Sequence, residues 1–173
     1  METSADDWIR QAVNDHSGLL TQYAYQLLKD WDRARDAVQE TFLKLCDQRR
    51  EVVMPKLKPW LYTVCRNQSL DYIRKESRMT EIDFMDELPS HEPSPMRPME
   101  LREEKSILLQ ALSQLTPQQR EVVRLKFLTN LSYKEISEIT GMNENLIGVL
   151  IHKGLKNLRS RMTEQLQSEA PSS

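Results

Sequence analysis

The sequence predicts an all-α protein, built from two small helical bundles joined by a flexible linker, with a helix-turn-helix in the C-terminal bundle. Helix-favouring Leu, Gln, Glu, Lys and Arg are abundant, whereas the 173 residues include only four glycines and 6% aromatic residues. Apolar residues recur at helical spacing, and long alternating runs of β-branched residues are absent. Four of the eight prolines fall within residues 80–100, which separates two helical parts.

The first part, residues 1–78, is expected to contain three helices. They are predicted at about residues 17–28, 32–47 and 58–78, with residues 47–57 as a loop. One stripe of the second helix recurs at i, i+3, i+4 and i+7 and should therefore face the core. It consists of Val38, Thr41, Phe42 and Leu45. Pro59 suits the first turn of the third helix, where an N–H group has no intrahelical partner.

A linker is expected at residues 79–100. This segment holds one Arg and six Asp or Glu residues besides its prolines, and it shows little apolar periodicity. Residues 49–78, by contrast, hold eight basic and three acidic residues, which favours contact with nucleic acid. A solvated helix face is the simpler reading of the same charges. The second part covers residues 101–163, and residues 164–173 are expected to form a disordered tail.

Local capping signals mark the helices of the second part. A first helix should begin at about Leu101. Thr116 and Gln119 have the spacing of a capping box, with proline between them at the first helical position. Ser132 and Glu135 repeat this capping box at the start of the next helix. Two helix starts are therefore predicted from local sequence alone.

A turn and a last helix complete the predicted helix-turn-helix. Gly141 should end the preceding helix in a left-handed conformation, and Asn143 should cap the next one. The inward side of the last helix is predicted as Ile147, Leu150, Ile151, Gly154, Leu155, Leu158 and Met162. The face left for a DNA groove is Asn143, Glu144, Asn145, Gly148, Val149, His152, Lys153 and Lys156, which is only partly basic. Gly148 costs about 1 kcal/mol of helix stability relative to alanine, so we expect it to allow a close backbone approach, either to DNA or to another helix.

Two stretches of the chain together resemble a known family. DAVQETFLKL at 36–45, followed by KPWLYTVCRNQSLDYIRK at 58–75, resembles region two of bacterial sigma factors. LTPQQREVVRLKFLTNLSYKEISEITGM at 115–142 resembles their region four. With only these regions and a short linker, the chain is similar to an extracytoplasmic-function (ECF) sigma factor. The resemblance implies a dissociable subunit of RNA polymerase that recognises and helps open promoters, with no catalytic residues, enzyme activity, cofactor or metal of its own.

The resemblance also implies sites in region two. The positions that match those binding the clamp helices of core RNA polymerase are Asp36, Gln39, Glu40 and Leu43. The positions expected at the minus-ten promoter DNA are Lys58, Trp60, Arg66, Asn67, Asp71, Arg74 and Lys75. Among these we expect Lys58, Asn67 and Arg74 to form a DNA-facing stripe. Two alternatives remain open: Trp60 as an interhelical residue, and Asp71 as an ion-pair partner of Arg74.

Region four departs from the pattern of its relatives. Many relatives carry threonine, then lysine or arginine and serine, near the start of the recognition helix, where this chain has Leu146, Gly148, Val149 and Leu150. The contacts with minus-thirty-five DNA are therefore expected from the eight residues of the groove face, of which Asn143 is the first and Lys156 the last. Val149 is expected at a thymine methyl group, and Asn143 or Asn145 at adenine. Lys153 and Lys156 are expected at phosphates.

Two other functions are compatible with parts of the sequence. A helix-turn-helix regulator without polymerase binding would explain residues 116–162 but leaves the region-two stretches unexplained. A protein–protein module that has lost DNA contact would explain the weakly basic recognition helix. Because relatives are commonly held by an anti-sigma factor, such a protein is a candidate partner alongside core polymerase and promoter DNA.

The sequence also indicates where the protein acts. The acidic N-terminus METSADDWIR is unlike a signal peptide, and the longest apolar run, residues 146–151, is too short to span a bilayer. We therefore expect a cytoplasmic protein with no membrane insertion. Cys46 and Cys65 lie in helical patterns without CxxC spacing and are expected to be reduced core thiols.

Overall fold

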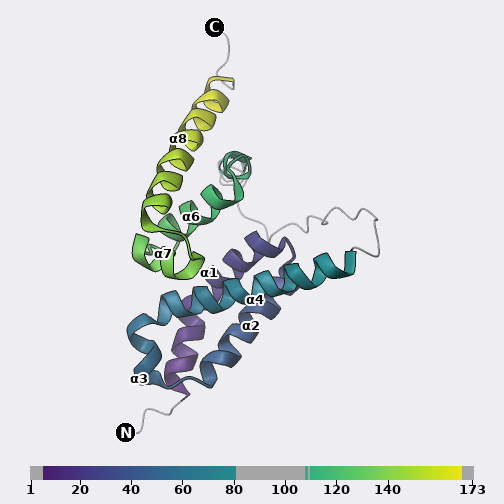
Figure 1. The fold of residues 1–173 in the computed structure, drawn as a ribbon, viewed down its shortest axis with the longest axis vertical. Helices are drawn as coiled ribbons and strands as arrows, with labels where there is room; N and C mark the ends of the chain where they lie inside the picture. The colour runs from purple at the N-terminus through teal and green to yellow at the C-terminus, as the bar shows by residue number, and fades with distance from the viewer. Residues whose placement is uncertain (1–5, 81–107, 109, 169–173) are drawn as a thin grey trace. The chain divides into compact units, whose positions relative to one another are not determined.

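The computed structural model describes residues 6–80, 108 and 110–168, and all regular structure within them is helical. The chain divides into two compact units, residues 1–90 and 91–173. The prediction of an all-α protein in two parts is confirmed (Figure 1). Met79 and Thr80, which were expected in the linker, are helical, and the rest of the predicted linker lies outside the described residues.

The first unit is a bundle of three long helices. They are α1 (Asp7–Leu28), α2 (Trp31–Cys46) and α4 (Leu57–Thr80), and each packs against the other two. The predicted inward stripe of α2 is buried, and it meets a core that includes Leu20, Leu61, Tyr62 and Cys65. Asp30 caps α2 by accepting a hydrogen bond from the backbone N–H of Arg33 at 3.1 Å.

The first helix begins earlier than the sequence indicated. We expected it at residue 17, but α1 begins at Asp7. Its first half is held by burial, since Ala12 is fully buried and Trp8, Ile9 and Val13 are half-buried. These residues repeat at helical spacing, a signal that the charged and polar residues between them obscured.

The predicted loop at residues 47–57 is mostly helical. It contains α3 (Arg50–Val53) and a 3-10 helix, η1 (Met54–Lys56), which lead from α2 into α4. Val53 is buried and anchors this connection to the bundle. Pro55 lies in the first turn of η1, where its missing N–H group loses no helical hydrogen bond.

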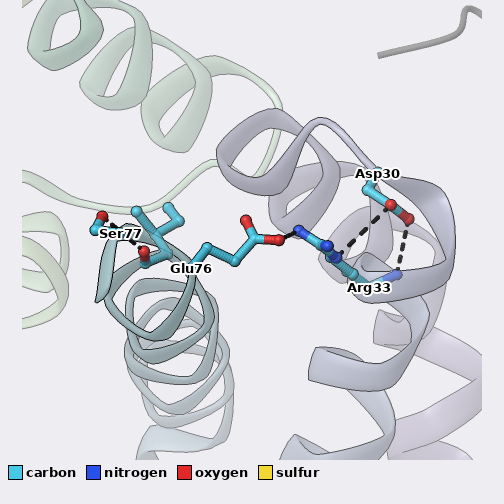
Figure 2. Close-up of polar contacts among 5 residues, drawn as sticks. Asp30, Arg33, Glu76 and Ser77 are labelled. Atoms are coloured by element: carbon cyan, nitrogen blue, oxygen red, sulfur yellow. Dashed lines mark hydrogen bonds and ion pairs between the residues drawn. The ribbon is translucent and has the colours of Figure 1, made fainter. Parts of the chain in front are cut away.

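An ion pair joins the start of α2 to the last third of α4. The Arg33 guanidinium contacts the Glu76 carboxylate and also approaches Asp30 Oδ2, 3.7 Å from its Nε. Figure 2 shows Arg33 between these two acidic side chains. The three side chains are about half exposed, so the pair aligns α4 with α2 but adds little stability.

The second unit contains α6 (Pro117–Phe127), α7 (Tyr133–Thr140) and α8 (Glu144–Ser168), preceded by a helical segment that ends at Ser113. The start predicted for this segment, at residue 101, lies outside the described residues. Both predicted capping boxes are present. The hydroxyls of Thr116 and Ser132 accept hydrogen bonds from the backbone N–H groups of Gln119 and Glu135, both at 3.2 Å. Gly141 ends α7 with φ of 74°, as predicted.

The last helix extends past the predicted second part. Residues 164–168, which were expected in a disordered tail, belong to α8, and the rest of that tail lies outside the described residues. Gln165 donates a hydrogen bond to Gln110 Oε1 at 3.1 Å and so joins this extension to the preceding helical segment. Met162, predicted to face inward, is exposed because its turn of α8 lies beyond the core.

Candidate functional site

The outer face of α2 presents the four residues expected to bind polymerase. Asp36, Gln39, Glu40 and Leu43 are all exposed. Leu43 is 60% exposed, although Phe42 and Leu45 on either side are buried. The face is therefore a leucine surrounded by polar and acidic groups, which suits a docking surface better than a solvated one.

A hollow of about 640 Å³ lies beside this face, between α1 and α2. Gln39 and Leu43 line it, together with Phe42 of α2 and Ile9 and Val13 of α1. The contribution of α1 was missed because its first half was not predicted to be helical. The hollow enlarges the apolar surface available to a partner that docks on α2.

The residues expected at minus-ten DNA follow α4 but do not share one face. Asn67, Asp71, Arg74 and Lys75 are exposed, whereas Lys58, Trp60 and Arg66 are half-buried. Asn67 and Arg74 are seven residues apart, close to two turns, so they lie on the same side. The structure therefore brings together the later residues of the set.

Lys58 does not belong to the predicted stripe. It precedes Asn67 by nine residues, which is two and a half turns of helix and reverses its direction. Burial lowers the pKa of His16 on α1; Asp15 opposes this effect, and the positive charge of Lys58 lowers the pKa further. Lys58 therefore lies near α1, on the other side of α4 from Asn67 and Arg74.

The alternative role considered for Asp71 is the one present in the structure. Its Oδ1 lies 3.4 Å from Nη1 of Arg74, and the two side chains are 57% and 70% exposed. An ion pair this exposed is weak and can open when a phosphate approaches Arg74. Trp60 is half-buried, in keeping with an interhelical position.

A second group of cations precedes α4. Arg49, Arg50 and Lys56 are exposed around α3 and η1. Val52 and Met54 are exposed among them. The cations can bind the phosphates of a single strand, and the apolar side chains offer contacts for its bases although neither is aromatic.

The groove face of α8 is exposed as predicted, except at Gly148, which is half-buried. Asn143 caps the helix by accepting a hydrogen bond from the backbone N–H of Asn145 at 2.8 Å. Beneath this face, Ile147, Ile151 and Gly154 are buried. The helix is thus fixed by its inward side, and its outward side remains available for contact.

Gly148 was expected to allow a close backbone approach to DNA or to another helix, and within the protein the close approach between helices is at Gly154. A Cβ atom at Gly148 would lie 3.5 Å from Cε2 of Tyr133, which is an ordinary contact. A Cβ atom at Gly154 would lie 2.9 Å from Cγ2 of Val123 and would clash. The glycine that allows α8 to pack closely on α6 is therefore the buried one.

The two cysteines differ in environment. Cys65 is buried, and burial raises the pKa of its thiol to about 12, against the hydrogen bonds of Thr41 and Ser69. Cys46 is exposed, which corrects the prediction of two core thiols. Within the described ranges, no three His, Cys, Asp or Glu side chains are grouped to bind a metal, and no helix is long and apolar enough to cross a membrane.

Comparison with known proteins places both units in one family. Residues 12–79 match Sigma-70 region 2, and residues 105–158 match Sigma-70, region 4. The ECF RNA polymerase sigma factor SigM of Bacillus subtilis is 28% identical over 169 residues, which cover 95% of this chain and 98% of SigM. The ECF sigma factor SigL of Mycobacterium tuberculosis is 27% identical over 159 residues, 90% of this chain and 89% of SigL.

Solved structures show the same fold. The sigma factor RpoE of Bartonella quintana, solved in complex with the anti-sigma factor NepR, has a TM-score of 0.66 and 23% identity. The likeness covers 96% of this chain and all of RpoE. CnrH, solved in complex with the cytosolic domain of CnrY, has a TM-score of 0.59 and 19% identity over 94% of this chain and 89% of CnrH.

Region 2 and region 4 matches lie in the same order as the two helical units, and the relatives match over nearly their whole length. This combination belongs to a group of non-enzymatic polymerase subunits. The chain is therefore an ECF sigma factor of the sigma-70 family, which directs transcription initiation by RNA polymerase.

Proposed function

We propose that the two units divide polymerase binding and promoter recognition between them. The first unit binds core RNA polymerase through α2 and holds the minus-ten element along α4, which runs to Thr80. The second unit places α8, which runs to Ser168, in the minus-thirty-five element. Because the protein binds promoter DNA, it acts in the cytoplasm.

The exposed leucine of α2 is the observation that carries the polymerase-binding role. Leu43 is 60% exposed, beside Gln39 and the apolar hollow, and Glu40 and Asp36 precede it on α2 by about one and two turns. An apolar centre with a charged rim is the usual anatomy of a protein interface. A coiled coil that carries Arg and Gln side chains, as the clamp helices of the family do, would complement these carboxylates.

The exposed residues of α4 and α3 are proposed to hold the opened minus-ten strand. Arg74 and Lys75 bind phosphates, and Asn67 supplies hydrogen bonds to a base. Arg49 and Arg50 extend the cationic surface toward α3, where Val52 offers an apolar contact. Lys58 contributes to the local potential from the side nearer α1 rather than as a member of this stripe.

Regulation by an anti-sigma factor is proposed as well. RpoE is in complex with NepR, and CnrH is in complex with a domain of CnrY. The hollow between α1 and α2 offers such a partner an apolar surface next to Leu43. A protein bound there would block core polymerase by occupying the same face.

The test is reconstituted transcription with core polymerase on a fragmented genomic library, with start sites mapped by sequencing. Discrete starts that share a proximal and an upstream motif are expected. Leu43→Ala should weaken core binding by about tenfold, as loss of a central interface residue does. Leu19→Ala, an exposed leucine on α1 outside the hollow, is the matched control and should bind normally. Equal binding by both variants would refute the assignment of the α2 face.

A further inference from the structure

Val149 lies at the middle of the exposed face of α8. The buried residues Ile147, Ile151 and Gly154 define the side of the helix that packs on the unit. Helical geometry places Val149 opposite that side, one turn after Asn145 and one turn before His152 and Lys153. Val149 is 48% exposed, so its apolar side chain points to solvent and does not contribute to the packing of the helix.

The exposed face changes character along its length. Its first turns carry Asn145, Leu146 and Val149, which are exposed and uncharged, and its one ionic group there is the acidic Glu144. From His152 onward the exposed residues on this side of the helix include Lys153, Lys156 and Arg159. Phosphate-binding charge therefore begins only where the neutral part ends.

This division fits duplex DNA better than a protein partner. A recognition helix meets base edges with its N-terminal residues and the backbone with residues further along. The exposed apolar side chains of these turns are Leu146 and Val149, with an amide before Val149 and cations after it, whereas a protein-docking patch is broad and apolar. Thymine is the base that presents a methyl group in the major groove, and valine cannot form a hydrogen bond with any base.

We propose that Val149 reads the C5-methyl group of a thymine in the upstream promoter element, and that α8 separates base reading from phosphate binding. This inference rests on the proposed role of region four and adds the chemical group that is read. Sequence preference then comes from a contact that salt does not weaken. The cations after His152 supply the salt-dependent part of the affinity.

The experiment removes the methyl group from the DNA and the side chain from the protein separately. Holoenzyme reconstituted from core polymerase and the full chain is titrated with duplexes that carry the mapped upstream motif. Each thymine in turn is replaced by deoxyuridine, which lacks only the methyl group. Loss of one buried methyl contact should weaken binding about fourfold at one position. Val149→Ala should bind the thymine duplex several-fold more weakly and show no further loss with deoxyuridine.

Two further measurements separate this inference from its alternatives. Val149→Ala should leave the salt dependence of binding unchanged, whereas Lys153→Ala should reduce the slope of log K against log salt by about one. Asn157→Ala, exposed on α8 outside the predicted contact set, is the matched control and should change neither quantity.

The negative outcomes are distinguishable. If deoxyuridine has no effect, or the same effect on both proteins, the inference is overturned and the role of region four stands. If no upstream motif is found, both fail together. If Val149→Ala instead weakens binding to core polymerase without DNA, the face docks protein and the inference is wrong. The deoxyuridine series with the unaltered protein does not depend on any variant folding.

Discussion

Alanine substitution of the two glycines in α8 should change stability in opposite directions. At Gly148 the added Cβ meets only the edge of Tyr133, at 3.5 Å. The variant should therefore gain most of the helix propensity difference between glycine and alanine, about 1 kcal/mol. At Gly154 the same gain is opposed by a Cβ that would lie 2.9 Å from Cγ2 of Val123.

The clash at Gly154 is expected to exceed the gain. Val123 is 5% exposed and belongs to a cluster with Leu115 and Leu158, so it has little room to move. Its β-branched side chain also has one strongly preferred rotamer in a helix. Overpacking of this kind costs about 1–3 kcal/mol, which leaves Gly154→Ala less stable by about 1 kcal/mol. The two variants should thus differ by about 2 kcal/mol, or roughly 10 °C in melting temperature.

Thermal unfolding with two probes can measure this difference. All three tryptophans, Trp8, Trp31 and Trp60, lie in the first unit, so their fluorescence should report no change in either variant. Far-UV circular dichroism should show the transition of the second unit move up for Gly148→Ala and down for Gly154→Ala. If Gly154→Ala is as stable as Gly148→Ala, the packing argument is wrong. Adding Val123→Ala should cost less in the Gly154→Ala background than in the unaltered protein, because it removes the clash.

Three further predictions concern the stability of each unit. Cys46 should react with a thiol reagent in the folded protein, whereas Cys65 should react only after unfolding. Because burial raises the pKa of Cys65 from 9.0 to about 12, its thiol ionises at a lower pH in the unfolded protein than in the folded one. In urea denaturation the free energy of unfolding should therefore be at its full value below pH 9 and fall as the pH rises to 12, by up to about 1.4 kcal/mol per pH unit. Cys65→Ala should show a shallower fall. Glu76→Gln removes the half-exposed pair with Arg33 and should lower the stability of the first unit by less than about 1 kcal/mol in tryptophan-monitored unfolding. Arg120→Ala should lower the stability of the second unit by about 2 kcal/mol, measured by circular dichroism. Its guanidinium donates three hydrogen bonds of 2.7 to 3.1 Å to the backbone carbonyls of Leu112, Ser113 and Leu115, and an unchanged midpoint would show that these bonds do not stabilise the unit.

Features set by neighbouring residues were predictable from the sequence. The capping boxes at Thr116 and Ser132 need only a side chain and an N–H group three residues later, so residue identity and spacing are sufficient. The positive φ of Gly141 is equally local. The buried stripe of α2 also followed from spacing, because a core-facing helix must present apolar residues at helical intervals.

Features set by the packing of other helices were not predictable. Spacing put Gly154 on the inward side of α8, but it could not show how closely Val123 of α6 approaches this glycine, because that depends on how the two helices cross. The predicted stripe of Lys58, Asn67 and Arg74 was wrong for a different reason. Nine residues separate Lys58 from Asn67, and this spacing alone puts the two residues on opposite sides of a helix. The first half of α1 was missed because its stability comes from burial of Ala12 against the bundle, and its local sequence is mixed.

The sparse charge on α8 is compatible with promoter recognition because both units belong to one chain. A free DNA-binding domain needs many phosphate contacts, since each contributes to affinity independently of sequence. In the proposed function, region two brings region four to the promoter at a high effective concentration, so α8 would need only the few cations that follow His152. The uncharged side chains around Val149 then have more weight in selecting a sequence than in providing affinity. A helix face that contributes little to DNA affinity can therefore still select between DNA sequences.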